Sequence, residues 1–135
     1  MSHFTTIQTQ FTNPEALLKA LDDTGYKQVE LHQEAQPLYG YQGDKRPQTA
    51  EIIIRRQYVG RASNDLGFKR QEDGTYRAII SDYDRSRHNQ EWLNRLNQRY
   101  AYHVATAKLE EQGFALIAEE KQEDGRIHLV ARRAV

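Results

Sequence analysis

Three consecutive isoleucines, Ile52 to Ile54, restrict the fold of this chain more than any other feature of the sequence. They lie at the centre of the segment 50–58, and β-branched residues favour strands. A strand with one solvent-exposed face alternates apolar and polar residues, whereas an unbroken aliphatic run is typical of a strand covered on both faces. The segment therefore predicts a strand that is buried on both sides.

The segments around this strand predict two helices. Asn13 can cap a helix that starts at Pro14, and aliphatic residues then recur at helical spacing until Gly25, a plausible left-handed stop. A second, longer helix is predicted over residues 89–112 and is expected to end at Gly113. Its apolar residues recur at intervals of three and four: Trp92, Leu93, Leu96, Tyr100, Val104 and Ala107.

The remaining patterns predict strands, turns and loops. Asp73-Gly74 and Asp124-Gly125 are typical hairpin turns. Residues 33–49 are expected to form a loop because Pro and Gly recur among polar residues there, and residues 60–67 are expected to form another. The further strands are expected at residues 3–11, 26–32, 68–71, 76–80, 114–121 and 126–132.

Together these elements predict the α+β class, with a mostly antiparallel sheet of about six to seven strands and two helices, the second of them long. Gly25 and Gly113 each join a predicted helix to a strand, and the Asp-Gly turns recur, so the pattern leaves a β-α-β-β duplication open. No linker or low-complexity stretch divides the chain. We therefore expect residues 1–135 to form a single domain.

Composition excludes several classes of site. A chain of 135 residues can bury a core without help from disulfides or metals. The absence of cysteine excludes disulfides, thiol catalysis and cysteine-ligated zinc or iron–sulfur clusters. The formal net charge is zero, so overall charge gives no reason to expect nucleic acid binding. No leader pattern or membrane-length apolar run occurs, and a cytoplasmic location, or an equivalent organelle interior, is expected.

No motif of a known reaction occurs in the sequence. Both the phosphate loop G-x-x-x-x-G-K-[ST] and the dinucleotide fingerprint G-x-G-x-x-G are missing. The five histidines include no pair spaced as metal ligands on one helix face, and no serine lies in G-x-S-x-G. The sequence therefore assigns no catalytic residue, no metal ligand and no cofactor, and it favours a non-enzymatic protein.

The segment 39–67 has the most unusual content. Seven basic residues and three acidic residues lie between Asp44 and Arg70, interleaved with tyrosines. Such a segment can hold a carboxylate, a phosphate or an acidic partner. The alternative is structural, with arginines that flank a core strand and an Asn-Asp turn. The candidate ligand or partner site consists of Tyr39, Tyr41, Arg55, Arg56, Arg61, Asn64 and Asp65.

Several stretches resemble a known family. They include Leu38-Tyr39-Gly40-Tyr41-Gln42-Gly43, Ala50-Glu51-Ile52-Ile53-Ile54-Arg55-Arg56 and Ser63-Asn64-Asp65-Leu66-Gly67-Phe68. The similarity resumes at Gln98-Arg99-Tyr100-Ala101-Tyr102 and Gln112-Gly113-Phe114. The family is hypothetical chloroplast reading frame number thirty-five, of cyanobacteria and algal plastids, whose domain has no known function. The resemblance implies a cyanobacterial cytoplasm or plastid stroma, and partners such as a ferredoxin-like protein or an AAA-type ATPase.

The leading hypothesis is a non-enzymatic accessory or adaptor protein of photosynthetic organisms that acts through protein–protein contacts. The alternative is a small-molecule or anion-binding domain that uses the same Arg/Tyr segment. An enzyme with Asp65 or His88 as an acid–base group and a nucleic-acid-binding protein are less favoured classes. A homo-oligomer is also open, because an exposed strand edge can pair two copies, although the sequence does not reveal which strand is outermost.

Overall fold

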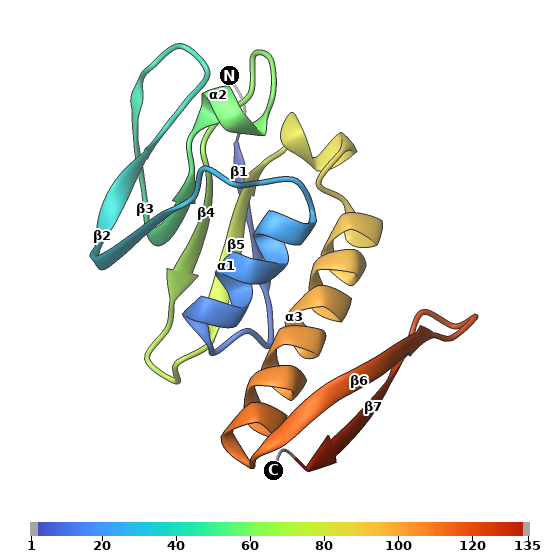
Figure 1. Ribbon diagram of the computed structural model, residues 1–135. Coiled ribbons are helices and arrows are strands. Elements are labelled where there is room, and N and C mark those ends of the chain that lie inside the picture. The colour runs from blue at the N-terminus through green and yellow to red at the C-terminus, as the bar shows by residue number, and fades with distance from the viewer. Residues whose placement is uncertain (1–2, 134–135) are drawn as a thin grey trace.

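The computed structural model describes residues 3–133, apart from the side chains of residues 116–118. Helical segments separate single strands and hairpins along the chain (Figure 1). The elements in order are β1 (Phe4–Gln8), α1 (Pro14–Asp23), β2 (Glu30–Tyr39), β3 (Lys45–Ile54), α2 (Arg56–Val59), β4 (Leu66–Arg70), β5 (Tyr76–Ser81), the 3-10 turn η1 (Asp84–Ser86), α3 (Gln90–Glu111), β6 (Phe114–Lys121) and β7 (Ile127–Arg133).

Strands β1 to β5 form one sheet in the order β1-β5-β4-β3-β2, and every neighbouring pair is antiparallel. Helices α1 and α3 lie side by side across one face of this sheet (Figure 1). Strands β6 and β7 form a separate two-stranded sheet. The predicted α+β class is confirmed, and the seven strands of residues 3–133 are divided between two sheets.

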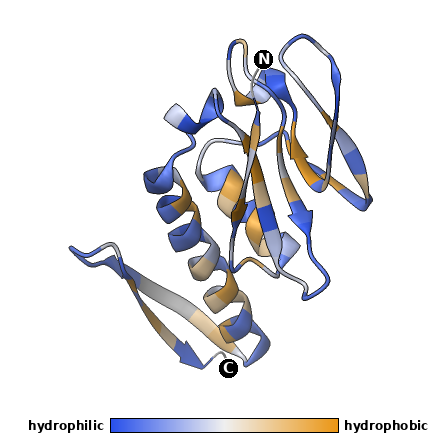
Figure 2. Ribbon diagram, turned by 180° about the vertical axis from the view of Figure 1, so that it is seen from behind, coloured by the Kyte–Doolittle hydropathy of each residue, from blue (hydrophilic) through white to orange (hydrophobic). Residues whose placement is uncertain are grey.

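The main core lies between the five-stranded sheet and the two helices. Ile52 and Ile54 of β3 pack there against apolar residues of the helices, among them Leu17 of α1 and Leu96 of α3. The ring of Phe11, in the loop between β1 and α1, lies 4.7 Å from that of Tyr100 in α3. Figure 2 shows the hydrophobic residues concentrated on the central strands and alternating with hydrophilic residues along α3.

A second, smaller core covers the other face of the sheet. Ile53 of β3 and Ile79 of β5 pack there against Leu38 and Ala50, which come from the long β2–β3 hairpin. Gly67 of β4 allows this close approach, because a Cβ atom at this position would lie 2.8 Å from the Cβ of Ala50. The three isoleucines therefore alternate between two cores, as their sequence predicts.

The expectation of a loop at residues 33–49 is wrong, because most of that segment belongs to β2 and β3. Pro37 is tolerated because β2 is the outermost strand of the sheet, where one row of backbone N–H groups needs no partner. Register shifts on both sides of Pro37 absorb the irregular backbone. The turn itself is short, and Gly43 adopts a φ of +79° within it.

The predicted segment boundaries differ elsewhere by a few residues. β3 stops at Ile54, and residues 56–59 form the one-turn helix α2 instead of continuing the strand. Both long helices begin as predicted, since Asn13 and Asn89 accept hydrogen bonds from the third following backbone N–H. The element order β-α-β-β occurs twice, at β1-α1-β2-β3 and β5-α3-β6-β7, but only the first hairpin joins the main sheet.

Candidate functional site

Asp65 lies at the centre of the segment that the sequence singled out. Its side chain is 1% exposed and precedes β4 directly. One carboxylate oxygen accepts hydrogen bonds from the backbone N–H of Tyr39 at 2.8 Å and from Nη1 of Arg55 at 2.9 Å. The other accepts from the backbone N–H of Arg56 at 2.7 Å. Asp65 therefore connects the ends of β2 and β3 to the start of β4.

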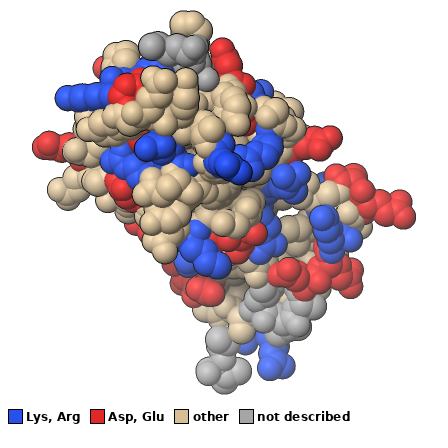
Figure 3. All heavy atoms as spheres, turned by 90° about the horizontal axis from the view of Figure 1, so that it is seen from above, with Lys and Arg blue, Asp and Glu red and all other residues tan. Residues whose placement is uncertain are grey.

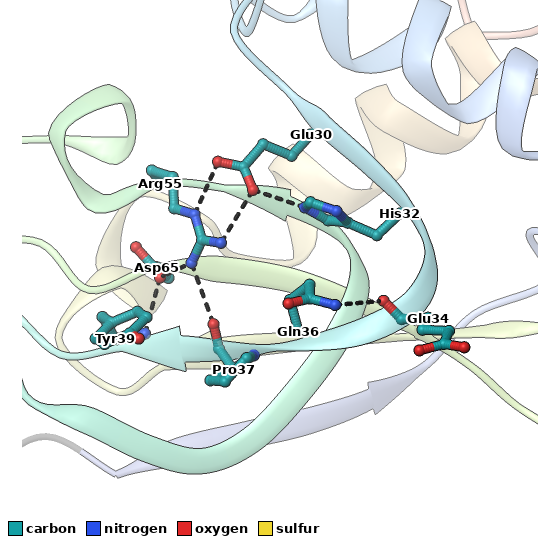
Figure 4. Close-up of polar contacts among 8 residues, drawn as sticks. All are labelled: Glu30, His32, Glu34, Gln36, Pro37, Tyr39, Arg55 and Asp65. Carbon is teal, nitrogen blue, oxygen red and sulfur yellow. Dashed lines mark hydrogen bonds and ion pairs between the residues drawn. The ribbon is translucent and has the colours of Figure 1, made fainter.

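Arg55 is bound on several sides (Figure 4). Its Nε and Nη2 atoms donate to the two carboxylate oxygens of Glu30 at 2.9 Å each, and Nη1 also donates to the carbonyl oxygen of Pro37 at 3.1 Å. This two-pronged geometry is the strongest form of arginine–carboxylate contact. The hydrogen bonds from Arg55 hold the pKa of Glu30 below its ordinary value, and Glu30 in turn raises the pKa of Arg55.

Asn64 belongs to a second buried network. Its Oδ1 accepts from the backbone N–H of Tyr41 at 3.0 Å, and its Nδ2 donates to Oγ of Ser81 at 2.9 Å. The hydroxyl of Ser81 donates to Oδ2 of Asp84, which also accepts from the backbone N–H of Asn64. All three polar side chains are buried. They tie the β2–β3 turn to the segment that follows β5.

The seven predicted site residues thus divide into two groups. Arg55, Asn64 and Asp65 serve internal contacts, as the structural alternative expected. Tyr39, Tyr41, Arg56 and Arg61 remain wholly or partly exposed. Nη1 of Arg56 donates a hydrogen bond to the backbone carbonyl oxygen of Tyr41 at 3.0 Å, and this contact holds the Arg56 side chain against the β2–β3 turn.

Two exposed tyrosines at the same end were missed by the sequence reasoning. Tyr58 of α2 is 49% exposed, and Tyr83 before η1 is 53% exposed. The hydroxyl of Tyr83 donates to the backbone carbonyl of Arg61 at 3.4 Å, so residues 22 positions apart in the sequence meet here. We call the set Tyr39, Tyr41, Arg56, Tyr58, Arg61 and Tyr83 the Tyr/Arg end.

The Tyr/Arg end has a basic surface. It lies at the top of Figure 1, and Figure 3 shows Lys and Arg side chains across the middle of this face, with Asp and Glu mostly toward its edges. Two local carboxylates, Asp65 and Asp84, are buried and already accept hydrogen bonds. Burial of acidic groups beneath exposed arginines leaves positive charge outside.

A third polar cluster lies between η1 and α3, where the side chain of His88 is 2% exposed. Its Nε2 contacts the hydroxyl of Tyr26, and its Nδ1 lies 3.2 Å from the carbonyl oxygen of Asp84. The carbonyl can only accept, so Nδ1 carries the proton and Nε2 accepts from the tyrosine. Burial lowers the pKa of His88 and raises that of Tyr26. His88 is therefore a packed neutral histidine in this fold.

No cluster of three His, Asp or Glu side chains suited to a metal ion occurs within residues 3–133 as described. None of the described helices is long and apolar enough to cross a membrane. A cleft of about 490 Å³ lies away from the Tyr/Arg end, between α3 and the C-terminal hairpin, and includes Tyr102 and Leu129 in its lining.

Comparison with known proteins places the chain in a family. The family described as protein of unknown function (DUF1257) matches residues 20–130. The chain belongs to this family. The uncharacterized protein ycf35 of Cyanophora paradoxa is 32% identical to this chain over 134 residues, which cover 98% of each chain. The uncharacterized protein ycf35 of Pyropia yezoensis is 28% identical over 138 residues, again with 98% of each chain covered.

The family assignment confirms the resemblance seen in the sequence. DUF1257 carries no assigned activity, so it transfers no functional residue to the Tyr/Arg end. No solved structure matches this chain significantly.

Proposed function

We propose that this protein is a non-enzymatic accessory protein that binds a partner protein through the Tyr/Arg end. The observation that carries the proposal is the exposure of four tyrosines beside Arg56 and Arg61: Tyr39, Tyr41, Tyr58 and Tyr83. Tyrosine and arginine are enriched among the residues that contribute most to protein interfaces. Exposed tyrosines also bring large contact areas with little loss of side-chain freedom.

The buried networks under this end support the same proposal. Asp65 and Asn64 fix the backbone at Tyr39 and Tyr41, and Asp84 fixes the loop that carries Arg61. A surface held in one conformation before binding loses less conformational freedom when its partner arrives. The internal residues of the candidate site would therefore act on binding indirectly, as supports of the exposed ones.

The charge of the Tyr/Arg end selects the class of partner. Arginines are exposed there while the neighbouring Asp65 and Asp84 are buried, so the complementary surface would be acidic. A ferredoxin-like protein or an AAA-type ATPase remains a candidate partner. The ycf35 relatives make a cyanobacterial cytoplasm or plastid stroma the proposed location.

Affinity capture with matched charge variants tests the proposal. The tagged protein is incubated with soluble extract of its own organism at low salt and at about 0.5 M salt, where charges beyond about 4–5 Å are screened. We expect a stoichiometric acidic partner that is released by salt and is lost with Arg56→Glu plus Arg61→Glu. The control variant, Lys19→Glu plus Arg70→Glu, makes the same charge change at exposed positions outside this end.

The tyrosines are tested separately from the charges. Tyr58→Ala plus Tyr83→Ala should weaken the same complex by at least tenfold, because truncation of an interface anchor typically costs more than about 1–2 kcal/mol. Binding by isothermal titration of the identified partner gives this value. Equal capture by the wild type and by both site variants would remove the Tyr/Arg end as the binding surface.

A further inference from the structure

The described side chains of the C-terminal third form almost no core of their own. Among the described side chains, which leave out residues 116–118, Leu96 is the last fully buried hydrophobic one, and none from residue 97 onward is buried. Apolar side chains are nevertheless present. Ile127 and Leu129 of β7 are only half-buried, and Val130 is 37% exposed. This region therefore has apolar surface that a second molecule can bury.

The β6–β7 hairpin is also incomplete as a sheet. Within the described residues 3–133 its two strands pair only with each other, which leaves one free edge on each. A two-stranded hairpin gains stability from a third strand or from packing on a helix. Here α3 contributes one side of a cleft of about 490 Å³, and the other side includes Ile127 and Leu129. A strand added beside β7 would extend the wall of this cleft.

The turn of the hairpin determines which backbone groups face the free edge of β7. The N–H of Gln122 donates to the carbonyl oxygen of Arg126 at 2.6 Å, so these two residues form a hydrogen-bonded pair. Hydrogen-bonded and non-hydrogen-bonded pairs alternate along an antiparallel ladder. The backbone groups of His128 therefore point toward β6, whereas those of Ile127 and Leu129 point outward to the free edge.

We propose that β7 pairs antiparallel with β7 of a second copy, about a twofold axis through His128. In this register Ile127 lies opposite Leu129 of the second copy, and the outward backbone groups of both residues find partners. The two hairpins join into a four-stranded sheet with the order β6-β7-β7-β6, and Ile127 and Leu129 of both copies lie on the face that carries α3. Such an interface uses the same patch on both subunits.

Charge complementarity supports this register. The same pairing brings Glu123 and Asp124, in the turn of one copy, beside Arg133 and Arg132, at the end of β7 in the other. The twofold axis repeats this contact on the opposite side. Asp124 already pairs with Arg126 at 2.6 Å, but both side chains are more than half exposed, and such pairs hold their geometry weakly. The free edge of β7 therefore matches β7 of a second copy in its backbone hydrogen-bonding pattern, its apolar face and its charges.

Charge reversal in two separate variants tests the pairing. The turn variant carries Glu123→Lys and Asp124→Lys, and the end variant carries Arg132→Glu and Arg133→Glu. Each variant alone places like charges against each other across the axis, so we expect its self-association to weaken by at least about tenfold. A mixture of the two variants places opposite charges at both contacts and is expected to restore the dimer as a heterodimer. Analytical ultracentrifugation from about 1 μM to about 200 μM covers the affinity range of interest.

A crosslink tests the axis directly. The chain has no cysteine, so His128→Cys introduces a single thiol at the residue that faces its own copy. In the proposed register this is a non-hydrogen-bonded pair with Cα atoms about 4.5 Å apart, within the range that a disulfide spans. Mild oxidation should give a crosslinked dimer. Glu72→Cys, an exposed position in the β4–β5 turn, serves as the matched control.

The outcomes separate the proposal from its alternatives. A heterodimer in the mixture, together with a crosslink at position 128 and none at position 72, supports pairing through β7. A wild-type protein that stays monomeric at the highest concentration overturns the proposal. A dimer that neither charge variant weakens, or that gives no crosslink at position 128, places the contact elsewhere and overturns it equally.

Discussion

Truncation of Asp65 to alanine is expected to destabilise the fold strongly, although this residue lies in a segment selected as a binding site. The carboxylate is 1% exposed and accepts hydrogen bonds from two backbone N–H groups, those of Tyr39 and Arg56. It also accepts from the side chain of Arg55. Asp65→Ala leaves all three donors without this acceptor.

The size of the effect follows from these contacts. Each backbone N–H left without its acceptor costs about 1–1.5 kcal/mol, the lower end of the usual range, since both groups lie near the surface. Arg55 keeps Glu30 as a partner, so loss of its second carboxylate adds about 1 kcal/mol instead of the full cost of a broken buried pair. We expect a total loss of about 3–4 kcal/mol in the free energy of unfolding, or roughly 10–15 °C in Tm.

Urea unfolding followed by circular dichroism measures this loss. Glu30→Ala is the matched comparison, because Glu30 binds the same arginine but its side chain is 38% exposed. Its removal should cost less than about 1 kcal/mol. Asp65→Asn keeps one acceptor and a similar volume and should fall between the two. If Asp65→Ala proved no more destabilising than Glu30→Ala, the assignment of Asp65 to a structural role would be refuted.

Two further predictions concern other parts of the fold. Burial holds the pKa of His88 below its ordinary 6.5, so the unfolded chain binds a proton first as the pH falls, and the free energy of unfolding should decrease below about pH 6.5. In urea unfolding between pH 5 and 8, His88→Phe should show a shallower decrease than the wild type. Equal dependence of stability on pH in the two proteins would contradict this assignment. Gly67→Ala should cost about 1–3 kcal/mol by overpacking against Ala50, and Ala50→Gly in the same chain should recover part of the loss. Thermal unfolding of the single and double variants measures this coupling, and purely additive losses would argue against a steric cause.

The candidate site shows why local sequence identifies unusual residues more easily than it assigns their roles. The density of Arg, Tyr, Asn and Asp singled out the segment 39–67. It did not reveal that Arg55 pairs with Glu30, 25 positions earlier, or that Asn64 binds Ser81, 17 positions later. Tyr83 was missed for the same reason, since its place at the Tyr/Arg end depends on the contact with Arg61.

The hairpins show a similar division. The Asp-Gly turns predicted β4–β5 and β6–β7. Each turn has three residues between its closing pair and ends on a glycine, Gly74 or Gly125, with the positive φ that such a turn needs. Where the β2–β3 hairpin forms, the sequence predicts a loop, because Pro37 and several glycines are typical of loops. Pro37 fits a strand only because β2 lies at the edge of the sheet, and the local sequence does not predict which strand is at the edge.

The sequence by itself determined the α+β class, both long helices with their Gly ends and the Asn13 cap of the first, and the strand of isoleucines buried on two faces. These features depend on residues within a few positions of one another, through capping, turn geometry and side-chain periodicity. Only the tertiary structure decided that seven strands divide into sheets of five and two, and that Arg55 and Asp65 are bound internally while tyrosines remain exposed. The sequence also did not predict that one edge of β7 stays unpaired within the described residues. Each of these outcomes depends on contacts between residues far apart in the chain, whose partners are chosen by packing and charge in three dimensions.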